Sequence, residues 1–161
     1  MNHTLECFIQ LEGIDGECKQ SKHKDWIDVL NYSYALEQST AVQSGGGSGV
    51  GKAKFAPLTF THFVDKASPN LLKYCAAGKH IPKVILVASK AGDGSQEFMR
   101  ITLTQVLIVG VSPSGGSNGQ AVENVGLSYA TIEVKVKEQK HDGSMGPEIT
   151  GAWDIKANKE I

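Results

Sequence analysis

Apolar and polar residues alternate along several short stretches of the chain, which is the pattern of β-strands buried on one face. Thr4–Leu11 carries its apolar side chains mainly at odd positions, with Glu6 and Gln10 on the other side. Trp26–Leu36 is a longer alternating stretch, and a third one covers Lys54–Phe63. These stretches predict strands in the first half of the chain.

The two faces of the stretch Trp26–Leu36 differ in character. Its even positions are large and mostly aromatic, which suits a core, and its odd positions grade from aliphatic to small and polar, which suits a surface. The predicted core set is Trp26, Leu30, Tyr32, Tyr34 and Leu36, and the predicted surface set is Ile27, Val29, Asn31, Ser33 and Ala35.

One short helix is predicted after the third strand. Ser68 is a suitable N-cap, Pro69 fits the first helical position, and Gly78 suits the residue just past the end. The expected apolar stripe consists of Leu71, Leu72, Cys75 and Ala76.

Strand patterns return in the second half of the chain and lead to a fold class. The expected strands are Lys83–Lys90, Glu97–Val109, Val122–Val136 and about Glu148–Lys156, with a hairpin turn at 91–95 and loops at 112–120 and 140–147. About seven strands, one helix and no alternation of strand and helix predict an all-β fold, a mainly antiparallel barrel or sandwich with one short flanking helix. With 161 residues, the chain is expected to be a single domain over 1–161.

A glycine- and serine-rich tract at about 39–54 interrupts this pattern and predicts a flexible extended loop. Residues 46–52 match the first seven positions of a phosphate-binding P-loop, but Ala53 stands where a magnesium-binding hydroxyl is needed, and a strand pattern follows instead of a helix. Nucleotide binding is therefore not expected.

Composition excludes several classes of function. The net charge is −1, and Arg100 is the only arginine among sixteen basic residues, whereas nucleic-acid readers depend on a basic excess and on arginine. No apolar run approaches the length of a membrane span, and no signal peptide is visible, so synthesis in the cytoplasm without membrane insertion is expected.

No set of residues indicates catalysis, a cofactor or a metal. The five histidines show no metal-ligand spacing, and the carboxylates do not suggest an acid–base pair. Cys7, Cys18 and Cys75 lack metal or redox spacing, and we expect reduced thiols. Cys75 is placed on the helix stripe, and Cys18 in a charged loop where oxidation after export is conceivable. We therefore expect no enzyme activity.

Charge is uneven along the chain: residues 1–37 carry −4, residues 38–92 carry +6 and residues 93–161 carry −3. Chance and solvated loops would explain this distribution. The alternative is a subunit whose surfaces of opposite sign meet head to tail in a ring or filament.

Motifs in order along almost the whole chain carry a family resemblance. They are Ile27–Leu30, the tract ending in Gly51–Lys52, Leu58–Thr61, Asp65–Leu71, Gly78–His80, Lys90–Gly92, Glu123–Val125 and Gly151–Lys156. With these motifs the chain resembles the Hcp family (haemolysin-coregulated protein), the tube protein of bacterial type VI secretion systems.

The resemblance implies a β-barrel of the phage tail-tube type that forms homohexameric rings. The rings would stack into a tube that is wrapped by a contractile sheath, tipped by a VgrG-type spike protein and able to carry small effector proteins in its lumen. The protein would assemble in the cytoplasm and be secreted through the apparatus without a signal peptide.

Site residues are implied as well. The tract 39–54 corresponds to the extended loop that reaches the neighbouring ring, and its expected stacking residues are Val42, Gly45, Gly46, Gly47, Gly49, Val50, Gly51, Lys52 and Lys54. Asn31, Ser33 and Ala35 are expected to face the lumen and its cargo, although alternation alone leaves open that they face an adjacent subunit.

Two other functions remain open at this point. A tail-tube subunit of a phage-like contractile particle would share the architecture, and a small-molecule-binding β-barrel or hydrolase would need a pocket. A hollow ring would favour a tube subunit, and a monomer with a deep pocket would favour a small-molecule-binding β-barrel or hydrolase.

Overall fold

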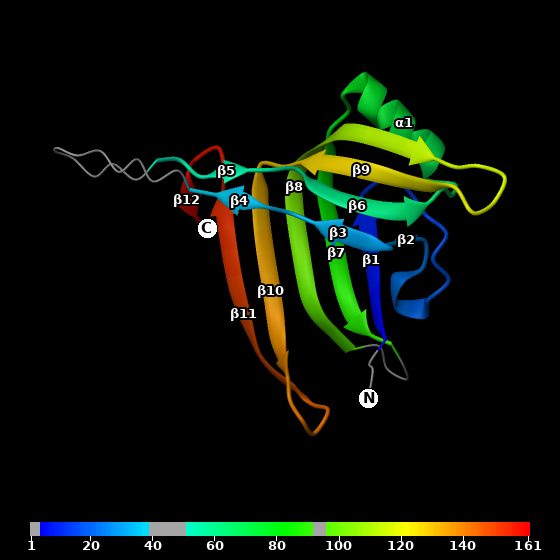
Figure 1. Ribbon diagram of the computed structural model, residues 1–161. Coiled ribbons are helices and arrows are strands. Elements are labelled where there is room, and N and C mark those ends of the chain that lie inside the picture. The colour runs from blue at the N-terminus through cyan, green and yellow to red at the C-terminus, as the bar shows by residue number, and fades with distance from the viewer. Residues whose placement is uncertain (1–3, 39–50, 92–95) are drawn as a thin grey trace.

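The structure is a computed structural model that describes residues 4–38, 51–91 and 96–161, and its strands form two antiparallel sheets joined through one long strand (Figure 1). The first sheet has the order β12-β11-β10-β8-β7-β1-β2. Its strands are β1 (Leu5–Leu11), β2 (Ile27–Asp28), β7 (Ile81–Lys90), β8 (Gln96–Ser114), β10 (Thr131–Gln139), β11 (Met145–Asp154) and β12 (Lys159–Glu160).

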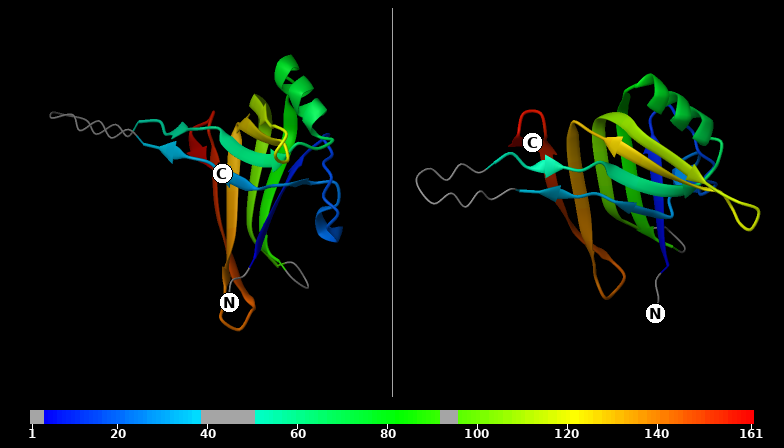
Figure 2. Two further views of the ribbon diagram at one scale, coloured as in Figure 1. Left: turned by 45° about the vertical axis from the view of Figure 1, so that its right-hand side comes forward. Right: turned by 45° about the horizontal axis from the view of Figure 1, so that its top comes forward.

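The second sheet crosses the first one (Figure 2) and has the order β3-β6-β9-β8. Its other strands are β3 (Asn31–Ser33), β6 (Leu58–Phe63) and β9 (Val122–Ser128). Two short strands, β4 (Leu36–Glu37) and β5 (Lys54–Phe55), pair separately, and a short 3-10 turn covers Ser21–His23.

Strand β8 belongs to both sheets because it bends near its middle. Its first part pairs with β7 as far as Val106, and the part from Leu107 to Ser114 pairs with β9. Gln105 lies at the junction with a φ of 48°, a left-handed conformation that few residues other than glycine adopt. This bend turns the end of β8 into the second sheet.

The core lies between the crossing sheets. Ile9, Leu86 and Leu103 from the first sheet and Phe60 and Leu127 from the second are almost completely buried in one cluster. Side chains that alternate along each strand therefore point inward from both layers, as the sequence pattern predicts.

The all-β, antiparallel fold class with one short helix is confirmed, but the barrel is not closed. Among the described strands, no ladder joins β2 at the end of one sheet to β3 at the end of the other. The chain crosses between them at two adjacent residues: the Val29 N–H donates to the Cys7 carbonyl, and the Leu30 N–H donates to the Thr61 carbonyl.

This crossing corrects the predicted inward face of the stretch Trp26–Leu36. Ile27 and Val29 are buried, whereas Leu30 is 47% exposed. From Tyr32 the even positions do turn inward, as predicted. The alternation changes phase because the segment leaves one sheet and enters another, and Leu36 beyond it is 53% exposed.

Two other predicted strand boundaries were wrong. The stretch Val122–Val136 is two strands, β9 and β10, which diverge at Tyr129 and Ala130. Strand β8 continues through Ser114, where the sequence predicts a loop. Most of the predicted hairpin turn at 91–95 lies outside the described residues.

The predicted helix is α1 (Ser68–Ala77), and Gly78 ends it at a φ of 62°. The Gly78 N–H donates to the Cys75 carbonyl, which satisfies a carbonyl at the helix end. The start of the helix differs from the prediction by one residue, because the N-cap is Ala67 rather than Ser68. Only part of the predicted stripe is buried, since Leu71 is fully buried but Leu72 is 63% exposed.

Cys18 lies in a loop, as predicted, but its side chain is buried. It packs with Phe8 and Val87 in a small second cluster, because the segment after β1 folds back over the outer side of the first sheet. In the part of the chain that is described, no helix has the length and apolar character needed to cross a membrane.

Candidate functional site

An uncharged face covers the outer side of the second sheet. The ladders place Asn31 opposite Thr61, Thr61 opposite Asn124, and Asn124 opposite Ser112, in one row across β3, β6, β9 and β8. A second row runs from Ser33 through Thr59 to Gly126 and Gly110. We call these eight residues the polar face: Asn31, Ser33, Thr59, Thr61, Gly110, Ser112, Asn124 and Gly126.

Hydrogen bonds between neighbouring strands fix the side chains of the polar face. The hydroxyl groups of Ser33 and Thr59 lie 2.8 Å apart, and the Thr61 hydroxyl donates to Oδ1 of Asn124. The alternate residues Leu58, Phe60 and Val125 anchor the same strands in the core. The face is therefore a fixed surface of small hydroxyl and amide groups with no charge.

Of the three residues predicted for a lumen, Asn31 and Ser33 lie on the polar face and are exposed. Ala35 is exposed too, but it lies beyond β3, and its carbonyl accepts a hydrogen bond from the Ala56 N–H. The sequence reasoning did not select Thr59, Thr61 or Asn124. The alternation of threonine with Phe60 along β6 places Thr59 and Thr61 on one face of their strand, but it does not relate them to Asn31, Ser33 or Asn124.

Only part of the predicted stacking loop can be placed. Gly51, Lys52 and Lys54 are exposed, and Lys54 pairs with Glu37 in the ladder of β4 and β5. These two strands leave the body of the molecule side by side (Figure 1). The other predicted residues lie outside the described residues: Val42, Gly45, Gly46, Gly47, Gly49 and Val50.

An apolar hollow of about 470 Å³ lies where β4 and β5 meet the first sheet. It is lined by Tyr34, Leu36, Phe55, Val134 and Trp153, among others. The Tyr129 hydroxyl donates to the Ala56 carbonyl at 3.0 Å beside it, which fixes the chain just after β5. The base of the β4–β5 pair is thus built into the body of the protein.

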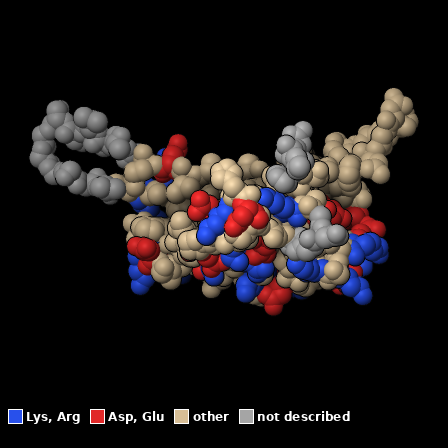
Figure 3. All heavy atoms as spheres, turned by 90° about the horizontal axis from the view of Figure 1, so that it is seen from below, with Lys and Arg blue, Asp and Glu red and all other residues tan. Residues whose placement is uncertain are grey.

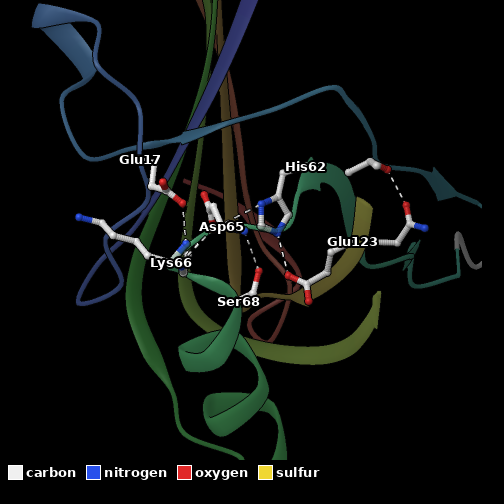
Figure 4. A network of polar contacts seen from close by, with 9 residues as sticks. Glu17, His62, Asp65, Lys66, Ser68 and Glu123 are labelled. Atoms are coloured by element: carbon white, nitrogen blue, oxygen red, sulfur yellow. Dashed lines mark hydrogen bonds and ion pairs between the residues drawn. The ribbon is translucent and has the colours of Figure 1, made fainter. Parts of the chain in front are cut away.

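A buried polar cluster lies beneath the polar face and joins β6, β9 and the start of α1 (Figure 4). The His62 Nε2 atom is 2.8 Å from Oε1 of Glu123, and both side chains are buried. The His62 Nδ1 atom is 3.8 Å from Oδ1 of Asp65 and has no hydrogen-bond partner among the described residues.

Asp65 organises the turn into the helix. Its Oδ1 accepts a hydrogen bond from the Ala67 N–H, and its own N–H donates to the Ser68 hydroxyl. Burial raises the pKa of the Asp65 carboxyl, and the bond from Ala67 opposes part of that rise. The cluster therefore ties the helix start to the sheet.

A second hollow, of about 670 Å³, lies between α1 and the end of β8. Its lining is mostly apolar, with Val64, Leu72, Cys75, Val111 and Pro113, and it also includes Asp65 and Glu123. We call it the helix groove. Leu72 and Val64 are 63% and 43% exposed, so large apolar side chains face solvent there.

The thiols are not arranged for chemistry. Burial raises the pKa of the Cys7 thiol to about 12, and burial raises the pKa of Cys18 as well. Both thiols are therefore protonated near neutral pH, which makes them poor nucleophiles. Within the described ranges, no three histidine, cysteine or acidic residues gather as metal ligands.

Two edges of the second sheet have no ladder partner among the described strands. Strand β3 pairs only with β6, and β8 from Leu107 to Ser114 pairs only with β9. Elsewhere the surface mixes charges: Figure 3, which views the molecule from below, shows lysine and acidic side chains intermingled over much of that side.

Comparison with known proteins gives consistent matches over almost the whole chain. Residues 8–136 match the family described as "Type VI secretion system effector, Hcp". The curated Protein hcp1 of Pseudomonas aeruginosa is 40% identical over 159 residues, which cover 96% of this chain and 98% of that protein.

Solved structures agree with the sequence matches. The crystal structure of Hcp1 from Salmonella typhimurium has a TM-score of 0.83 at 40% identity, with 98% of this chain and 99% of that chain covered. A type VI secretion system effector from Yersinia pestis has a TM-score of 0.75 at 31% identity, with 92% and 99% covered. A further type six secretion system protein has a TM-score of 0.91 at 26% identity, with 98% and 100% covered.

Proposed function

The chain belongs to the Hcp family of secreted type VI secretion system proteins, and we propose that it is the structural subunit of the secretion tube. In this function six copies form a ring, rings stack into the inner tube, and sheath contraction expels the tube. The protein acts by assembly and binding rather than by catalysis.

The observation that carries the proposal is the polar face, on a sheet whose two outer edges have no ladder partner among the described strands. All three ladders of the second sheet are antiparallel, so its outer strands, β3 and the end of β8, run in opposite directions. In copies related by rotation, β3 of one copy would therefore lie antiparallel to β8 of the next. Such head-to-tail pairing continues the sheet from copy to copy and closes into a ring.

A ring closed in this way places the polar face on one wall, and we propose that this wall lines the channel. Asn31 and Ser33 then contact the cargo, with Thr59, Thr61 and Asn124 beside them, and Ala35 lies at the end of this wall. An uncharged wall of hydroxyl and amide groups offers hydrogen bonds to a small effector protein without trapping it by long-range charge.

The β4–β5 pair supports a function in stacking. Its two strands stand just before and at the end of the tract 39–54, and Lys52 and Lys54 are exposed at the described end of that tract. We propose that this tract, with Val42 and Val50, contacts the next ring. The VgrG-type spike and the contractile sheath are the further partners that family membership implies.

Light scattering with negative-stain imaging of the reduced protein tests the proposal. The expected result is a species of six subunits with a central hole. A compact monomer at every concentration would contradict it and would favour a small-molecule-binding protein. Deleting 45–51 tests the stacking function, because rings should persist while tubes are lost.

A further inference from the structure

The helix groove is an apolar surface that the tube function leaves without a partner. It lies between α1 and the end of β8, beside the β8 edge that has no ladder partner among the described strands. Leu72 is 63% exposed in this groove, and Val64 is 43% exposed. Leaving such large apolar side chains in contact with water is unfavourable.

Leu30 is another large apolar side chain that is exposed, and it lies at the opposite edge of the second sheet. It directly precedes β3, the other outer strand, and is 47% exposed. Its N–H is bonded to the Thr61 carbonyl, so the backbone that carries the side chain is fixed. Leu30 and the groove lie at opposite edges of one sheet and cannot meet within one chain.

Charge separates the same two surfaces. Residues 66–83, which include α1, carry four lysines and no acidic residue, and Lys66, Lys73, Lys79 and Lys83 are all exposed. Residues 25–37, which surround Leu30, carry Asp25, Asp28 and Glu37 and no basic residue. A copy that presents the second segment to the first is therefore attracted in one orientation.

We propose that the helix groove is the docking site for a second copy of this chain, whose Leu30 side chain enters the groove while its acidic segment 25–37 faces the lysines of the segment 66–83. The two surfaces differ, so each copy donates Leu30 to one neighbour and accepts it from the other, as a closed ring requires. This inference rests on the proposed ring and identifies the side chains that hold its subunits together.

Cys75 provides a native test because it lines the groove. In the variant Leu30→Cys, a docked neighbour places its new thiol beside Cys75, and copper phenanthroline should link the subunits into a covalent ladder on a non-reducing gel. Leu30→Cys combined with Cys75→Ser should give no ladder. Ile149→Cys, which places a thiol at a position 73% exposed on β11, should give none either.

Assembly and thiol protection give a second measurement. Leu30→Glu and Leu72→Glu should each convert six-subunit rings into smaller species with an unchanged far-ultraviolet circular dichroism spectrum, and Ile149→Glu should retain rings. N-ethylmaleimide should label Cys75 at least tenfold faster in Leu30→Glu than in wild-type rings.

The outcomes separate the two proposals. If wild-type protein forms no six-subunit species, the proposed tube function fails, and this inference fails with it. If wild-type rings form, but Leu30→Cys gives no ladder and Leu30→Glu still forms rings with Cys75 labelled at the wild-type rate, then the tube function stands and the docking site is wrong.

Discussion

The Nε2 atom of His62 lies 2.8 Å from Oε1 of Glu123, and both side chains are buried. These residues face each other in the ladder of β6 and β9, directly under the polar face. Their hydrogen bond therefore joins two of the strands on which Thr61 and Asn124 are carried. The second sheet is fixed from its inner side as well as by its backbone ladder.

Removal of one partner should leave the other buried and unsatisfied. We expect Glu123→Ala to lower the free energy of unfolding by about 1–3 kcal/mol. Glu123→Gln, which can still accept a hydrogen bond, should cost less than half as much. Urea unfolding of both variants against wild type measures the difference, and equal stabilities for all three would show that the pair contributes nothing.

The Asp65 carboxyl should make the folded protein less stable as the pH rises, which is the opposite of the usual effect of a carboxylate. Burial raises its pKa in the folded protein, so the unfolded chain loses this proton at a lower pH than the folded protein does. The buried carboxylate therefore destabilises the fold at neutral pH, and this cost disappears as the pH falls below the unfolded pKa of about 3.9.

Asp65→Asn isolates that contribution because an amide oxygen can still accept the bond from the Ala67 N–H. The variant should gain stability relative to wild type as the pH rises from 4 to 7, in parallel unfolding series. A difference that stays constant with pH would contradict the assignment. Glu17, Glu123 and His62 are the charged groups that act on Asp65, and all three are present in both proteins.

Sequence alone predicted the all-β class, the single helix and the ends of that helix, because alternation and capping are local signals. It could not predict the crossing at Val29 and Leu30, since nothing in a single alternating stretch shows that its two halves pair with different strands. β9 and β10 were read as one strand, although the buried apolar positions change from odd in β9, at Val125 and Leu127, to even in β10, at Ile132.

The candidate site was predicted in part for a related reason. Asn31 and Ser33 stood out because small polar side chains replace the aliphatic residues of their own strand. Thr59 and Asn124 belong to the same face only through the registers of β3 with β6 and of β6 with β9. Register is a property of the folded sheet, so the two rows of the polar face could be recognised only in the structure.

Cys7 and Cys18 should resist thiol reagents in the native protein. With a pKa of about 12, the Cys7 thiol is ionised in about one molecule in ten thousand at pH 8. Iodoacetamide at pH 8 should therefore leave both residues unmodified until urea unfolds the protein, as peptide mass spectrometry can measure. Rapid native alkylation of Cys18 would show that the segment covering it opens easily.

A label at Ser33 can determine whether the polar face lies on the inner or the outer surface of the ring. Its side chain is exposed, and its hydroxyl bonds to that of Thr59, so Ser33→Cys should cost little stability. A maleimide-linked gold cluster at this position should appear in the central hole of negatively stained rings. Thr150→Cys, on the exposed surface of β11, serves as the control and should place the cluster outside the hole.

The same position tests cargo binding without changing charge. In rings whose channel is lined by the polar face, Ser33→Gln adds six longer side chains at one level of the wall and should weaken retention of a co-expressed effector. Ring mass by light scattering should not change, because Ser33 points away from the core, and Thr150→Gln should leave retention at the wild-type level. Loss of rings in Ser33→Gln, or gold clusters on the outer rim in Ser33→Cys, would instead place this residue at a contact between subunits.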